Sequence, residues 1–63
     1  MFIEFDMSNS KGRVYIDPDA VIALHEDLYK NVTTIHCADK EFPVYGKIAA
    51  VAKKLGLELS EGA

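Results

Sequence analysis

The residue types in this chain that could bind a metal ion or act in catalysis are two histidines, one cysteine and several aspartates. They are His25, His36, Cys37, Asp6, Asp17, Asp19, Asp27 and Asp39. Metal sites in small domains need three or four such ligands at recognisable spacings, as in paired CxxC or HExxH motifs. The sequence contains no such spacing, so we predict neither a metal site nor a cofactor.

The histidines and the cysteine are predicted to lie apart from one another. Adjacent residues of a strand point to opposite faces, so His36 and Cys37 cannot readily share one ion. If residues 20–37 form a hairpin, His25 lies opposite about Thr33, which separates it from His36 along the sheet. Beside Cys37 there is no basic cluster that would stabilise a thiolate. We therefore predict no catalytic residue and expect that the protein is not an enzyme.

Charge and length restrict the classes of function further. The chain has a net charge of -3, which repels phosphate backbones, and its seven Lys and Arg residues are scattered rather than clustered. Its 63 residues suffice for a single domain spanning 1–63, with residues 60–63 expected as a loose end. The single cysteine predicts a reducing, cytoplasmic location, and the first residues lack the pattern of a signal peptide or membrane span.

The elements that position these residues begin with a predicted hairpin. Residues 1–7 and 13–17 alternate apolar and polar side chains, which is typical of half-buried strands. Between them, Gly12 can adopt the positive φ that a hairpin bulge often needs. Asp17 is expected to cap one helical turn or a type I turn that starts at Pro18.

Two or three further strands are predicted in the middle of the chain. Residues 21–25 and 32–37 are rich in β-branched side chains and are separated by a link of hairpin length. Residues 41–44 are predicted to form a short fifth strand. Pro43 would restrict that strand to a strand end or a sheet edge, because proline cannot donate to the ladder.

An amphipathic helix is predicted for residues 47–55. Its apolar stripe, at i, i+3, i+4 and i+7, consists of Ile48, Val51, Ala52 and Leu55. Gly46 is the only candidate cap at its start, and Gly56 stands where a left-handed residue would end it. The predicted fold class is therefore α+β, with a small antiparallel sheet of four to five strands packed on one C-terminal helix.

Apolar side chains are predicted on both faces of the sheet, although one helix covers only one face. Phe2 and Tyr15 fall on the face opposite to Phe5 and Ile16. So small a core often needs a disulfide, a metal or a partner subunit, and only the partner remains here. We expect a homo-oligomer, or a complex with another protein, that pairs through a sheet edge or the uncovered face. Phe2, Tyr15 and Tyr29 would be its aromatic anchors.

The segment GRVYIDPDAVIAL at residues 12–24, with the threonine-rich strand and the helix after it, resembles the small flagellar FlbD-type proteins. The likeness covers about residues 12–56. It implies a strand, an Asn-Pro-Asp-like turn, two further strands and a helix, in this order. Comparable small proteins occur in phages and prophages, so the resemblance implies a bacterial or phage origin and leaves the role open.

Residues 14–55 are also similar to the first half of LytTR-type DNA-binding domains. That likeness implies sequence-specific DNA binding, with phosphate contacts from Lys11, Arg13, Lys47, Lys53 and Lys54. The acidic residues in the rest of the chain make the helix lysines more typical of a solvated face. We therefore expect a non-enzymatic interaction, accessory or regulatory module, with nucleic-acid binding as the alternative.

Overall fold

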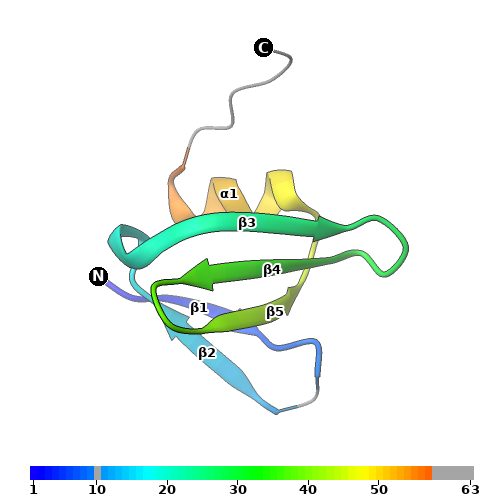
Figure 1. Cartoon of the computed structure of the whole chain (residues 1–63), viewed down its shortest axis with the longest axis horizontal. Helices are drawn as coiled ribbons and strands as arrows, with labels where there is room; N and C mark the ends of the chain where they lie inside the picture. Colours follow the sequence, from blue (N-terminus) through cyan, green and yellow to red (C-terminus); the bar gives the residue numbers. More distant parts are fainter. Residues whose placement is uncertain (10, 58–63) are drawn as a thin grey trace.

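The computed structural model describes residues 1–9 and 11–57 and has an α+β fold with one C-terminal helix (Figure 1). Its elements are β1 (Ile3–Asp6), β2 (Arg13–Ile16), the 3-10 turn η1 (Pro18–Ala20), β3 (Val21–Asp27), β4 (Val32–Cys37), β5 (Glu41–Tyr45) and α1 (Ile48–Leu55). All five predicted strands are present. The loose end expected at residues 60–63 lies outside the described residues.

The strands form two antiparallel sheets, so the prediction of a single sheet of four to five strands is wrong. β1 pairs with β2, while β3, β4 and β5 form a three-stranded meander. Between the sheets, Met7 pairs with Val44 in an isolated bridge, and the Ser8 N–H donates to the Pro43 carbonyl at 2.9 Å. Pairing stops there because the chain turns away after Met7, whose N–H already bonds to Gly12 across the hairpin loop.

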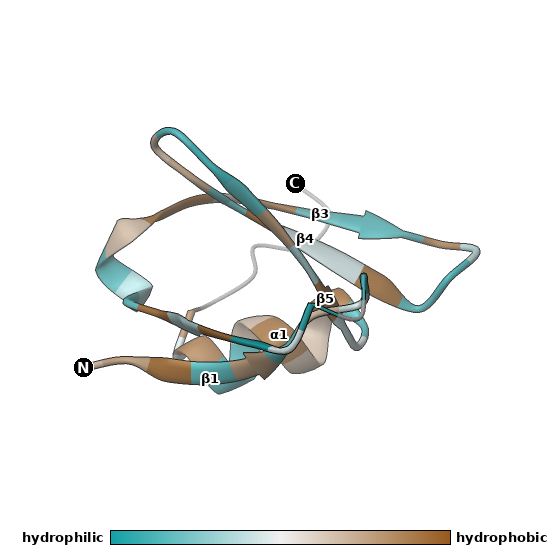
Figure 2. Cartoon of the chain, turned by 90° about the horizontal axis from the view of Figure 1, so that it is seen from below, coloured by the Kyte–Doolittle hydropathy of each residue, from teal (hydrophilic) through white to brown (hydrophobic). Residues whose placement is uncertain are grey.

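The β1–β2 hairpin and α1 lie on the same side of the three-stranded sheet (Figure 2). The hairpin contributes Phe5 and Ile16 to the core and the helix contributes Val51, Ala52 and Leu55; Ile35 and Val44 of the sheet lie between them, fully buried. Burial of these side chains supplies most of the driving force for folding. No described element lies over the opposite face of the three-stranded sheet.

The turn and the helix end form as the local sequence predicts. The Asp17 carboxylate accepts a hydrogen bond from the Asp19 N–H at 3.0 Å, and Pro18 occupies the first position of η1. At the other end of the chain, Gly56 is left-handed with φ 75°. The Leu57 N–H then donates to the Ala52 carbonyl at 2.9 Å, which completes the helix cap.

The start of α1 differs from the prediction. Lys47 is the N-cap and makes no side-chain cap, so Gly46 does not have the predicted role. Instead the Glu26 carboxylate, on β3, accepts a hydrogen bond from the Ile48 N–H at 2.9 Å. A carboxylate at this position satisfies a free N–H and complements the positive end of the helix dipole. β3 extends to Asp27, beyond its predicted end, which places Glu26 inside the strand.

Candidate interaction surface

A surface that the fold leaves uncovered is the outer face of β3, β4 and β5. The strand registers and the alternation of side chains define it. We call it the sheet face; its residues are Ala23, His25, Asp27, Val32, Thr34, His36, Glu41, Pro43 and Tyr45. Its polar and apolar side chains are mixed, and its two carboxylates, Asp27 and Glu41, lie toward its margins.

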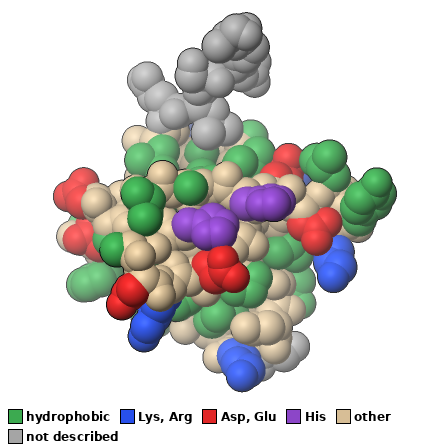
Figure 3. Space-filling view, viewed as in Figure 1, with side chains coloured by type: hydrophobic (Ala, Val, Ile, Leu, Met, Phe, Trp, Pro, Cys, Tyr) green, Lys and Arg blue, Asp and Glu red, His purple; other side chains and the backbone are tan. Residues whose placement is uncertain are grey.

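Two rows of three residues cross the middle of the sheet face. In one row, Ala23, His36 and Glu41 lie opposite one another; in the adjacent row, His25, Thr34 and Pro43 do so. His25 and His36 are therefore diagonal neighbours on one face. Figure 3 shows the two histidine side chains side by side on this surface.

The structure corrects the predicted position of His25. It lies opposite Thr34, not Thr33, because the pairing of Asp27 with Val32 centres the β3–β4 turn between Tyr29 and Lys30. A shift of one residue moves a side chain to the other face of a sheet. Thr33 faces inward, where its hydroxyl donates to the Gly46 carbonyl at 2.9 Å. Sequence reasoning therefore missed the histidine pair.

A carboxylate orients one of the two imidazoles. The His36 Nδ1 lies 3.3 Å from the Glu41 Oε2, and both side chains are accessible to solvent. With Nδ1 directed at this carboxylate, the Nε2 of His36 is on the side of the ring that faces away from it. Small side chains lie opposite each histidine, Ala23 across from His36 and Thr34 across from His25.

Apolar side chains lie at two ends of the sheet face. Tyr45 is 59% exposed, and Ile22, which forms a bulge between Val21 and Ala23 at the edge of β3, is 68% exposed. Next to Tyr45 is an open hollow of about 450 Å³. Its lining includes Lys30, Thr34, Pro43 and Tyr45, together with Ser8 from the hairpin loop.

The predicted aromatic anchors do not form one cluster. Phe2 precedes β1, and Tyr15 lies on the outer side of the hairpin, where both are exposed. Tyr29 lies in the β3–β4 turn and is 97% exposed. The three anchors therefore belong to two separate regions of the surface.

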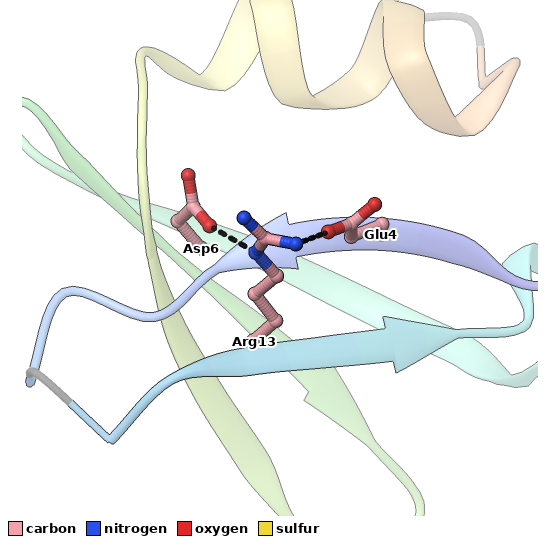
Figure 4. A network of polar contacts seen from close by, with 3 residues as sticks. All are labelled: Glu4, Asp6 and Arg13. Atoms are coloured by element: carbon pink, nitrogen blue, oxygen red, sulfur yellow. Dashed lines mark ion pairs between the residues drawn. The ribbon is translucent and has the colours of Figure 1, made fainter.

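The outer side of the hairpin is charged at its centre. Arg13 contacts two carboxylates, with its Nη1 3.0 Å from Glu4 and its Nε 3.4 Å from Asp6 (Figure 4). Both carboxylates come from β1, and Arg13 reaches them from the adjacent β2. Exposed pairs of this kind add little stability, but they balance the charge of Arg13.

The basic residues predicted as phosphate contacts are also dispersed. Lys11 lies in the hairpin loop, and Lys47 lies near Glu26 and Asp27 at the β3–β4 turn. Lys53 and Lys54 are in the last turn of α1, where the Lys54 Nζ stands 4.8 Å from the centre of the Phe5 ring. These positions, with the paired Arg13, do not form a continuous basic patch.

The described residues contain no cluster of three or more His, Cys, Asp or Glu side chains that could hold a metal ion. Cys37 is half-buried at the end of β4, on the side opposite to His36. Within residues 1–9 and 11–57, no helix has the length and apolar character needed to cross a membrane. No protein-family model matches the chain, and comparisons with curated proteins and with solved structures give no match.

Proposed function

We propose that the protein is a non-enzymatic interaction module that self-associates through the sheet face. The observation that supports this proposal is the one-sided packing of the fold. The hairpin and α1 both pack on the inner face of β3, β4 and β5, which leaves the outer face uncovered with Tyr45 and Ile22 exposed. An antiparallel sheet with exposed large apolar side chains is a common site of protein contact.

A second copy of the chain would cover the sheet face together with its margins. The molecule measures 35 × 29 × 20 Å, and the sheet face is viewed along the shortest dimension in Figure 3. A standard interface takes about 800 Å² from each partner, so the contact would extend beyond the sheet face to its margins, where Ile22 and Tyr45 are exposed. A small domain with no disulfide within the chain also gains stability when it associates.

The distribution of charge favours the sheet face over the outer side of the hairpin as the contact between two copies of the chain. The centre of an interface is usually depleted of charged residues. The centre of the sheet face is occupied by Thr34 and Pro43, whereas the hairpin has Arg13 between two carboxylates. The dispersed lysines likewise give DNA binding less support than self-association.

The edge of β3 is a less suitable contact than the face. The bulge at Ile22 interrupts the regular backbone of the strand, and Glu26 places an inward-pointing charge near its other end. Natural proteins use both devices to prevent pairing between sheet edges. We therefore assign self-association to the face and not to the edge.

Sedimentation velocity in the presence of EDTA tests the proposal over a range of protein concentrations. The wild-type chain is expected to form a dimer that dissociates on dilution. Thr34→Arg, which introduces a charge at the centre of the face, is expected to shift the chain to monomer. Tyr29→Arg makes the same change in charge at the turn and is expected to leave the dimer intact.

Two results would overturn the proposal. One is a wild-type chain that remains monomeric at every concentration. The other is a dimer that Tyr15→Ala dissociates while Thr34→Arg does not, since that result would place the contact on the hairpin. Circular dichroism of each variant verifies that the fold is retained. The predicted cytoplasmic location is tested separately by fractionation of the source cell.

A further inference from the structure

We infer that His25 and His36 form half of a binding site for a divalent transition-metal ion such as Zn²⁺, and that a second copy of the chain supplies the other half. The inference rests on the proposed self-association through the sheet face. It goes beyond that proposal because it identifies a ligand and the residues that bind it. Imidazole nitrogens are suitable ligands for zinc, copper and nickel.

The strand register places the two histidines within reach of one ion. They occupy diagonal positions on adjacent antiparallel strands, since His36 pairs with Ala23 and His25 is two residues further along β3. Side chains at diagonal positions are within reach of each other when they are long or aromatic. Zinc–nitrogen bonds are about 2.0–2.1 Å long, and the residues directly opposite the two histidines on the adjacent strands, Ala23 and Thr34, have small side chains.

The contact between His36 and Glu41 is a second indication of a metal site. The Glu41 carboxylate lies 3.3 Å from Nδ1, which directs Nε2 away from the carboxylate. Histidines that bind metals commonly hold their other ring nitrogen against a carboxylate in this way, which fixes the ring and makes it more basic. Glu41 is therefore a positioning residue and not a ligand.

One copy of the chain does not supply a full set of ligands. Among the described residues, no group of three or more suitable side chains is close enough to hold an ion, and the histidine pair gives two nitrogens. A two-fold axis brings the same surface of each copy together. A dimer through the sheet face would thus provide four imidazoles, the number that a tetrahedral zinc ion requires.

Sedimentation velocity and isothermal titration calorimetry with Zn²⁺ alone test the site on a chain that has no affinity tag. We expect one Zn²⁺ per two chains. Because the ion binds only the dimer, it should tighten the dimer dissociation constant by about tenfold or more relative to EDTA. His25→Gln and His36→Gln are each expected to abolish this tightening, so that each variant has the same dimer dissociation constant with Zn²⁺ as with EDTA.

Two further variants distinguish the site from other zinc ligands. Glu41→Gln is expected to weaken Zn²⁺ binding by about tenfold, the usual effect of removing a carboxylate behind a ligand. Cys37→Ala is expected to leave Zn²⁺ binding unchanged, because Cys37 packs against the core on the other side of the sheet.

Several outcomes would overturn the inference. They are the absence of zinc binding, binding that survives both histidine substitutions, a stoichiometry of one ion per chain, or loss of binding in Cys37→Ala. Each leaves the proposed function standing if the chain still dimerises in EDTA and Thr34→Arg still dissociates it. A wild-type chain that is monomeric with and without Zn²⁺ would instead contradict both proposals.

Discussion

Glu26 connects the third strand to the helix through one side chain. Its carboxylate accepts the Ile48 N–H at 2.9 Å, in place of a local cap that the residues before α1 do not provide. Glu26→Ala leaves this N–H without its partner, so we expect the free energy of unfolding to fall by about 1–2 kcal/mol. Urea denaturation measures the change. Glu41→Ala, at an exposed position, serves as the control and should shift stability by less than about 0.5 kcal/mol.

Thr33 has a comparable role inside the core. It is fully buried, and its hydroxyl donates to the Gly46 carbonyl just before α1. Thr33→Val keeps the shape of the side chain and removes the donor, so we expect a loss of about 1 kcal/mol or more. The side chain of the neighbouring Thr34 faces outward, so the same substitution there should leave the free energy of unfolding almost unchanged. Equal effects in thermal unfolding would contradict the assignment of the two faces.

At the scale of single residues, the sequence predicts some structural roles and not others. Local rules place Asp17 at its turn and Gly56 at its helix end, because each role depends only on the next few residues. The histidine pair was not found, since it depends on the register of two strands and a one-residue error in that register moves His25 to the other face. Glu26 could not be found either, because its partner is distant in the chain.

The helix α1 is short, so its ends contribute strongly to its stability. Gly56 ends it with φ 75°, and a Cβ at this position would meet no atom within 4 Å. The cost of Gly56→Ala is therefore conformational, and we expect about 1 kcal/mol of lost stability. Gly56→Asn should cost less, because asparagine tolerates the left-handed region. Chemical denaturation of both variants measures the two losses of stability. Equal losses for Gly56→Ala and Gly56→Asn would contradict the left-handed role of this position.

Strands and helix are the features that the sequence predicts best. β4 has the predicted bounds, and α1 begins one residue after its predicted start. These elements follow from period-two alternation and from the i, i+3, i+4 stripe, which are local patterns. The division into two sheets does not follow from them, because alternation identifies a strand but not the strand edge that it pairs with. The bridge at Met7 depends on where the hairpin loop leaves the sheet.

At the scale of the whole molecule, one small core holds together the β1–β2 hairpin, the three-stranded sheet and α1. Ile35 lies at its centre with no exposed surface. Ile35→Ala is expected to cost about 2–5 kcal/mol, which approaches the total stability of about 3–5 kcal/mol typical of domains this small. The variant should be largely unfolded at 25 °C by circular dichroism. Leu28→Ala, at an exposed turn position, should unfold at nearly the wild-type temperature.

The isolated bridge between Met7 and Val44 has a consequence for the native-state fluctuations of the protein. Among the described residues, backbone-to-backbone bonds join the hairpin to the meander only at this bridge and at the Ser8–Pro43 hydrogen bond, so the hairpin can leave the shared core without breaking the ladders of β3, β4 and β5. Such partial opening occurs at a lower free energy than global unfolding. Amide protons of β1 and β2 should then exchange with solvent first, and those of β4, which is bonded along both edges, should exchange last.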